Sequence, residues 1–234
     1  EQDPSGYLDR IAEAVRELGR QHGGGDRIRC VGIGVPGNVD PYEGVVRDAV
    51  NLGWERIDLA AEMASRLDRH VVVEHDVRCF VAGEANAGAG AGCRHLIGVT
   101  VGTGIGAGIA VDGAVVRGAS WRAGEIGHDA VDGESAPCNC GKRGCLETIA
   151  SAPGIERMAA EAIRSGAPSD HPRLRKGNLS AHEVYLACLE GDRTAAEVFR
   201  RAGTALGRKL ATLVFALNPE RIVIGGGVAE AGEY

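Results

Sequence analysis

Apolar residues recur at intervals of three or four in residues 7–21, so the chain is expected to open with an amphipathic helix. Two short runs rich in β-branched residues, at 29–35 and 70–74, predict buried strands. A helix is predicted between them at 59–67, with Asp58 as its N-cap, and another helix follows the second strand. Helices and strands therefore alternate, which is typical of an α/β fold.

The rest of the chain continues this alternation around one irregular stretch. Apolar runs flank a glycine-rich turn near residue 103, and Asp112-Gly113 then separates two further apolar runs, a strong hairpin signal. Residues 118–146 show no periodicity. Ser180 begins a capping box, Ser-x-x-Glu, and a long helix is predicted at about 192–217, ahead of a last strand and three glycines.

Composition narrows the class of protein. The 234 residues are 44% hydrophobic and 25% charged, an ordinary globular balance. No apolar run approaches the roughly 18 residues of a membrane span. The net charge of −6 argues against a nucleic-acid-binding protein, because phosphate contacts need clustered Lys and Arg. Glycine, at 36 residues, is about twice its usual share and indicates tight turns of the kind that bind phosphates or sugars.

Cysteine usage indicates a reducing compartment. The seven cysteines are odd in number and unevenly spaced, and the first ten residues lack the features of an export signal, so a cytoplasmic protein without a disulfide framework is expected. Cys30, Cys79 and Cys188 stand in apolar stretches and are expected to be buried.

Two glycine loops invite a comparison with dinucleotide-binding motifs. Residues 32–37 match Gly-x-Gly-x-x-Gly, and residues 102–107 match the variant that ends in Ala. That motif works only where a helix begins inside it, but the first loop runs into Pro36 and the second into a hairpin. The dinucleotide interpretation is therefore disfavoured. The amides of the second loop suit a phosphate, although a plain glycine-rich hairpin is the alternative.

A cysteine cluster carries the sharpest local signal. Cys138, Cys140 and Cys145 fall within eight residues, and His128 is the nearest histidine upstream. Zinc takes four tetrahedral ligands of this kind, and a closed set of three Cys and one His is structural. The alternatives are three unrelated thiols, or a zinc-ribbon nucleic-acid module, which would need a second pair of ligands and a basic surface.

One stretch of the chain resembles the signature of the ROK family. It reads Gly124-Glu125-Ile126-Gly127-His128, followed by Cys138-x-Cys140-Gly141-x-x-Gly144-Cys145-x-Glu147. This family comprises sugar kinases, related transcriptional repressors and uncharacterised reading frames. Other segments resemble the family in the same order over essentially the whole chain: Gly34–Gly37, Asn51–Trp54, Glu74–Asp76, Gly102–Gly104 and Ile224–Gly227.

The resemblance implies an actin-like, ribonuclease-H-like α/β kinase with two lobes, 1–78 and 79–234, and an inserted structural zinc loop. It further implies ATP and Mg²⁺ as cofactors, a hexose as substrate, and a homo-oligomer, either dimer or tetramer. The implied site residues are Asp76 as general base; Gly37, Asn51, His75, Asp76, Glu125, His128 and Glu147 for the sugar; and Gly102, Thr103, Gly104, Gly225, Gly226 and Gly227 for the nucleotide.

Three departures from the family pattern matter. The opening Asp-x-Gly-x-Thr phosphate loop has no match, and the chain stops soon after the last glycine loop, so these residues are expected to be the middle of a longer kinase and not to be active alone. His75 stands where the family has Asn, which bears on the choice of sugar. Glucose phosphorylated at its 6-hydroxyl is the expected reaction. The alternatives are an amino or N-acetyl hexose kinase, a sugar-responsive repressor, and a zinc-stabilised interaction module.

Overall fold

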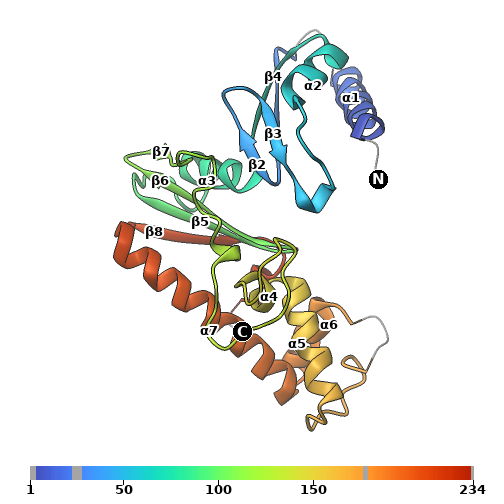
Figure 1. The fold of residues 1–234 in the computed structure, drawn as a ribbon, viewed down its shortest axis with the longest axis vertical. Helices are drawn as coiled ribbons and strands as arrows, with labels where there is room; N and C mark the ends of the chain where they lie inside the picture. Colours follow the sequence, from blue (N-terminus) through green and yellow to red (C-terminus); the bar gives the residue numbers. More distant parts are fainter. Residues whose placement is uncertain (1–3, 23–27, 176–178, 233–234) are drawn as a thin grey trace. The chain divides into compact units, whose positions relative to one another are not determined.

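The structure is a computed structural model that describes residues 4–22, 28–175 and 179–232 (Figure 1). The chain forms two compact units. Unit 1 takes in the described residues up to Cys79 together with Arg117–Arg122, and unit 2 takes in Phe80–Val116 and the described residues from Ala123 onward. The 117–122 segment therefore packs with unit 1, although its sequence neighbours on both sides belong to unit 2.

Unit 1 is built on two small sheets and two helices. Strand β1 pairs in parallel with β4, and β2 pairs antiparallel with β3. The elements are α1 (Pro4–Gln21), β1 (Cys30–Val35), β2 (Asn38–Asp40), β3 (Val45–Asp48), the 3₁₀ turn η2 (Val50–Leu52), α2 (Leu59–Leu67) and β4 (His70–His75), with α3 (Asp76–Ala87) starting in this unit. The hairpin β2–β3 was not evident from the sequence.

One face of the parallel sheet in unit 1 is buried and the other is exposed. Val71 and Val73 of β4 pack with Leu8 of α1 and Leu59 of α2 in the core of this unit. The opposite face carries Val72, which is 47% exposed. Cys30 lies at the start of β1 and is exposed, and Cys79 is also exposed, so the expectation that both thiols are buried is wrong. An apolar run alone does not tell whether both faces of a strand are covered.

Unit 2 contains a four-stranded sheet in the order β7-β6-β5-β8 and the remaining helices. Strands β5, β6 and β7 form an antiparallel meander, and β8 lies parallel to β5 on its other edge. The elements are β5 (Leu96–Val101), β6 (Ile105–Val111), β7 (Ala114–Val115), η3 (Ile126–His128), α4 (Glu147–Ala150), α5 (Ala152–Arg164), α6 (Ala181–Leu189), α7 (Arg193–Leu217), β8 (Arg221–Gly225) and η4 (Ala229–Ala231).

Local sequence signals account for several turns and helix ends. Asp112 and Gly113 both have positive φ, as the predicted Asp-Gly hairpin between β6 and β7 requires. The Ser180 hydroxyl accepts the backbone N–H of Glu183 at 3.3 Å and caps α6, which confirms that half of the capping box. Asp58 is the N-cap residue of α2, as predicted, but its side chain makes no capping bond and pairs with Arg56 at 3.6 Å instead.

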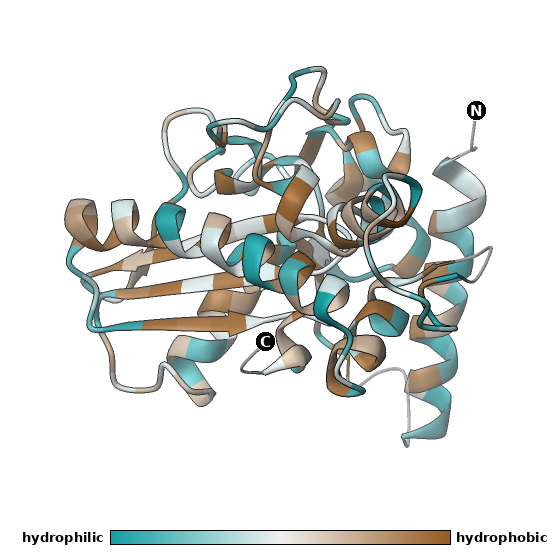
Figure 2. Cartoon of the chain, turned by 90° about the horizontal axis from the view of Figure 1, so that it is seen from below, coloured by the Kyte–Doolittle hydropathy of each residue, from teal (hydrophilic) through white to brown (hydrophobic). Residues whose placement is uncertain are grey.

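The core of unit 2 lies between the sheet and its helices. Figure 2 shows the strands of this sheet as mostly hydrophobic and α7 as banded between hydrophobic and hydrophilic residues. Val99 of β5, Ile155 of α5 and Phe199 of α7 belong to one buried cluster, which also contains Cys188, as predicted. These layers confirm the α/β class. Within the described ranges, no helix combines the length and apolarity needed to cross a bilayer.

Candidate active site

Asp76 stands where strand β4 ends and helix α3 begins. It is the first residue of the helix, and its carboxylate accepts the N–H of Val77 at 2.7 Å. His75 Nε2 lies 3.5 Å from the same carboxylate, whose side chain remains 51% exposed. A half-exposed carboxylate beyond the carboxyl end of a parallel strand is placed to meet a ligand.

Gly37 and Asp76 follow the ends of two neighbouring parallel strands. Val35, the last residue of β1, is paired with His75, the last residue of β4. A Cβ at Gly37 would lie 2.2 Å from the carbonyl oxygen of Asp48, so the chain after β1 runs directly against the end of β3. The exposed Asn51 follows on η2, three residues beyond Asp48. The sugar-side residues predicted in this unit thus cluster around the ends of three strands.

The two predicted nucleotide loops lie side by side in unit 2. Gly102–Gly104 forms the turn between β5 and β6, and Gly225–Gly227 follows β8, which is parallel to β5. A Cβ at Gly226 would lie 2.4 Å from the carbonyl oxygen of Val101, and its φ of 94° also requires glycine. The N–H of Val228 donates to the same carbonyl at 3.1 Å. The two loops therefore leave adjacent strands at the same edge of the sheet.

The segment with Glu125 and His128 lies along strand β6. The N–H of Ala107 donates to the carbonyl of Gly124 at 2.8 Å, and a Cβ at Gly124 would lie only 1.7 Å from the carbonyl oxygen of Ala107. This contact fixes the turn that leads into η3. Glu125 and His128 follow within four residues, and their side chains approach to 4.0 Å.

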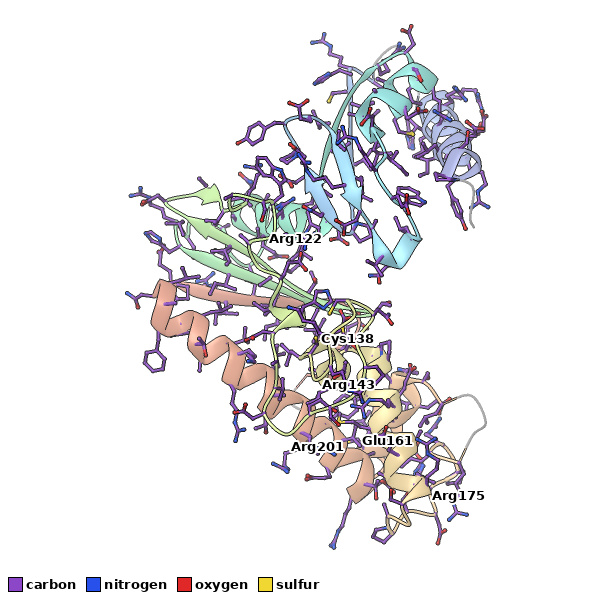
Figure 3. The ribbon with its side chains drawn as sticks, viewed as in Figure 1. Arg122, Cys138, Arg143, Glu161, Arg175 and Arg201 are labelled. Atoms are coloured by element: carbon purple, nitrogen blue, oxygen red, sulfur yellow. The ribbon has the colours of Figure 1, made fainter. Side chains whose placement is uncertain are left out.

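The four predicted metal ligands come together in one cluster. The ligand atoms of His128, Cys138, Cys140 and Cys145 all lie within 4.8 Å of one another. His128 Nδ1 is 3.5 Å from Cys138 Sγ, and Cys140 Sγ is 3.7 Å from Cys145 Sγ. Tetrahedral thiolates at about 2.3 Å from zinc are separated by about 3.8 Å, so the donor set and its spacing fit this ion. Figure 3 labels Cys138 in the loop that precedes α4.

The thiol environments differ within the cluster. Burial and the neighbouring thiols raise the pKa of Cys145 to about 12, and burial also raises the pKa of Cys138. Burial acts against ionisation of Cys140 as well, but bonds from the Lys142 backbone and the other thiols lower its pKa overall. A cation is therefore needed to hold all three sulfurs as thiolates at neutral pH.

Glu147 connects the cysteine cluster with the glycine turn. This first residue of α4 accepts the N–H of Ile105 at 3.2 Å through one carboxylate oxygen. Its other oxygen lies 3.8 Å from Cys138 Sγ. A Cβ at Gly104 would lie 2.7 Å from the Glu147 carboxylate, so this turn is packed against it. Metal ligands, glycine turn and Glu147 thus form one continuous region of unit 2.

Two ion pairs that sequence reasoning missed hold the cysteine loop against the helices behind it. Arg157 of α5 donates to Glu134 at 2.9 Å and to the carbonyl of Thr148 at 2.9 Å. Lys209 of α7 lies 2.6 Å from Asp129 and lowers the pKa of this carboxyl. The only available signal was a charged residue on the inner face of each helix.

Comparison with known proteins places the chain in a family. The ROK family model matches residues 1–234. A glucokinase from Halalkalibacterium halodurans is 39% identical over 229 residues, 95% of this chain and 69% of that protein. A glucokinase from Thermotoga maritima is 37% identical over 229 residues, 97% of this chain and 71% of that protein.

A solved structure gives the same result. The ROK family glucokinase from Streptomyces griseus, in complex with glucose and AMPPNP, superposes with a TM-score of 0.85 at 32% identity, over 97% of this chain and 73% of that one. The mixed α/β fold with its paired glycine loops is consistent with an actin-like kinase. The chain belongs to the ROK family.

Proposed function

We propose that this chain transfers the γ-phosphoryl group of ATP to a hexose, with the 6-hydroxyl of glucose as the first candidate acceptor. The chain is a sugar kinase of the glucokinase type, because glucokinases resemble it over nearly its whole length. ATP as donor is supported by the AMPPNP held in the Streptomyces griseus structure. Units 1 and 2 are proposed as the two lobes of the kinase.

Asp76 is proposed as the general base. A sugar hydroxyl is a poor nucleophile at neutral pH, and a carboxylate that accepts its proton as the phosphoryl group arrives removes this barrier. The position of Asp76 beyond the end of β4, half exposed and next to His75, carries this proposal. Phosphoryl transfer otherwise depends on alignment and on neutralising charge, to which Mg²⁺ bound with ATP contributes.

The glycine loops are proposed to hold the nucleotide. Within the turn Gly102–Gly104, the Gly102 N–H donates to the Gly104 carbonyl at 3.0 Å, so the exposed Thr103 and the backbone N–H groups of Thr103 and Gly104 are proposed for the phosphate oxygens. Gly225–Gly227 lies beside this turn, at the end of the neighbouring strand, and is proposed to face the adenosine.

The sugar contacts are proposed for the residues that the family resemblance assigns to them: Asn51, His75, Asp76, Glu125, His128 and Glu147 through their side chains, and Gly37 through its backbone. These residues offer carboxylate, amide and imidazole groups, which together can bind several hydroxyls in different directions.

We propose zinc for the cysteine cluster in a structural role. Nδ1 of His128 faces the thiols, while Nε2 lies on the side of Glu125. A closed set of three sulfurs and one nitrogen leaves no position for a reacting water. The metal would fix His128 and the loop that precedes Glu147, and through them the sugar side of unit 2.

A second substrate class has its own support. An N-acetylgalactosamine kinase from Shewanella is 33% identical over 99% of this chain and 73% of that protein. The regulator NagC of Escherichia coli is 33% identical over 96% of this chain and 52% of that protein, which keeps a sugar-responsive repressor as the non-catalytic alternative. His75 stands where the family has Asn, so the sugar that this site binds is tested over several hexoses.

The test is a coupled ADP-release assay of the full-length natural protein on glucose, mannose, glucosamine, N-acetylglucosamine and N-acetylgalactosamine. We expect turnover with glucose at the highest kcat/KM. A higher kcat/KM with an N-acetyl hexose would move the assignment to the second substrate class. Sugar binding without any ADP release would favour the repressor. Light scattering on the same preparation tests the proposed dimer or tetramer. A cytoplasmic location is proposed because the seven cysteines form no disulfide bonds with one another.

A further inference from the structure

Glu74, two residues before Asp76, is held by three donors. Its carboxylate accepts the N–H of His75 at 2.8 Å, Nε of Arg78 at 2.6 Å and Nε of Arg117 at 2.8 Å. Burial alone would raise the pKa of this carboxyl, but the three hydrogen bonds and the charge of Arg78 lower it. Glu74 is therefore an anion whose orientation is fixed from its own backbone, from α3 and from the 117–122 segment.

Arg78, two residues after Asp76, is more deeply buried than any other charged group in this region, with a side chain only 2% exposed. Besides Glu74, it donates to the carbonyl of Trp121 at 2.8 Å and to the carbonyl of Val39 at 3.1 Å. The planar guanidinium thus ties together α3, β4, β2 and the 117–122 segment. Three acceptors at fixed directions leave this side chain one conformation.

The contacts of Glu74 and Arg78 close into a ring. Arg117, which donates to Glu74, also lies over the ring of Tyr42 at 5.9 Å. Tyr42 in turn contacts the ring of Trp121 at 5.3 Å between centroids, and the carbonyl of Trp121 accepts from Arg78. Trp121 has a φ of 62°, which is costly for a bulky residue and persists only where its surroundings fix it.

Asp76 lies midway along the chain between Glu74 and Arg78. Its backbone is also packed against β1, since a Cβ at Gly34 would lie 3.5 Å from the Cα of Asp76. The strand end and the first turn of α3 are therefore fixed, while the Asp76 carboxylate stays half exposed. A general base needs this combination, because small displacements of a reacting group are costly.

We propose that Arg78 is a positioning residue for this site. By donating hydrogen bonds to Glu74, Trp121 and Val39, it fixes the junction between β4 and α3, and this junction orients the Asp76 carboxylate toward the sugar hydroxyl. The proposal rests on the proposed role of Asp76 as general base. Arg78 touches neither sugar nor nucleotide in this scheme. It acts on the geometry of the base and leaves the nucleotide loops of unit 2 untouched.

The experiment compares kcat, KM for sugar and KM for ATP in variants of the full-length natural protein. R78M removes the three hydrogen bonds of the guanidinium, and R78K keeps the charge but not the planar geometry. E74M/R78M removes both charges of the Glu74–Arg78 ion pair. R66M is the matched control, because Arg66 also lies in unit 1, is 18% exposed and pairs with Glu62 at 2.5 Å and Asp9 at 2.7 Å, all in the layer of α1 and α2. D76N gives the activity that remains without the base.

We expect kcat of R78M to fall by about 10²-fold, with KM for ATP within about twofold of wild type, and R78K to recover part of the loss. E74M/R78M is expected to regain thermal stability, because replacing a buried ion pair by apolar groups costs little, yet to keep the low kcat. R66M is expected to keep a wild-type kcat whatever its stability.

Three results would overturn the proposal, and they differ in what they imply for the proposed function. If R78M or E74M/R78M turns over as fast as wild type while D76N is inactive, Arg78 does not position the base and the proposed function stands. If D76N itself turns over normally, the role of Asp76 and the role of Arg78 both fall. A loss of kcat in R66M equal to that in R78M would show a general stability effect and would also overturn the proposal.

Discussion

The carboxylate of Glu147 accepts a hydrogen bond from the backbone N–H of Ile105 at 3.2 Å. Because the other oxygen of this carboxylate lies 3.8 Å from Cys138 Sγ, one side chain connects the cysteine cluster with the turn between β5 and β6. A change in the cluster is therefore transmitted to the glycine turn proposed for the phosphates.

The first prediction concerns the metal. Protein purified without chelator should contain one zinc per chain, and C140A should lose it, because three remaining ligands cannot close a tetrahedral site. C140A should also have a lower Tm and a raised KM for ATP. The measurement is metal analysis beside thermal unfolding. C93A changes a cysteine outside the cluster and should keep its zinc. Wild-type protein without zinc would refute the assignment.

The second prediction concerns the base. D76N keeps the size of the side chain but cannot accept a proton, so kcat should fall by about 10²–10⁴-fold. Sugar affinity, measured by calorimetry, should change much less. D68N is the control in the same unit, because Asp68 is fully exposed at the end of α2 and its left-handed backbone suits Asn as well. Near-normal turnover of D76N would remove Asp76 from the mechanism.

The third prediction concerns Gly124. Its φ is 92°, and a Cβ there would lie 1.7 Å from the carbonyl oxygen of Ala107, so G124A must break the contact between β6 and the turn before Glu125. Unfolding free energy should fall by about 2–4 kcal/mol, in the range of overpacking and backbone strain together. G203A is the control, since Gly203 lies in α7 with open space around it and Ala should stabilise the helix by up to about 1 kcal/mol. Urea denaturation of both variants decides the matter.

The fourth prediction concerns acid stability. Burial opposes ionisation of Glu134, but the N–H groups of Ser135 and Ala136 and the charge of Arg157 lower the pKa of this carboxyl overall. A lowered folded pKa means that the stabilisation is complete above the unfolded pKa of about 4.3 and is lost as pH falls through the folded value.

E134Q should therefore cost about 1–3 kcal/mol at pH 7, where it removes a charged acceptor of Arg157, and less at an acid pH below the lowered folded pKa, where the wild-type carboxyl is itself protonated. Urea unfolding at the two pH values measures this difference. An equal cost at both would mean that ionisation of Glu134 does not contribute to stability.

Periodicity and turn chemistry predicted most of the fold. The first helix, the strands β1 and β4, the Asp-Gly hairpin and the long helix α7 all lie within a few residues of their expected positions. Each is specified by neighbours in sequence, through apolar spacing or a left-handed turn. The short hairpin β2–β3 was missed, because its pairing residues do not alternate and its register shifts at Asn38 and Val39.

Distant charge pairs could not be predicted. The metal ligands were found because their spacing in sequence is itself the signal, and the structure brings their donor atoms together. By contrast, the partners of Arg78 lie 39 and 43 residues away along the chain, on Val39 and Trp121. Only the folded chain shows that this arginine is buried, since arginine in a helix is ordinarily read as exposed.

The packing of the 117–122 segment with unit 1 has a consequence for fragments of this chain. Cleavage between Cys79 and Phe80 would separate the first unit from the rest, yet the segment that donates Arg117 to Glu74 would remain in the second fragment. The first fragment would lack one of the three donors to Glu74 and one of the carbonyl acceptors of Arg78. The two fragments would therefore be complementary. The segment 117–122, with its two arginines and Trp121, would allow the second fragment to bind the first.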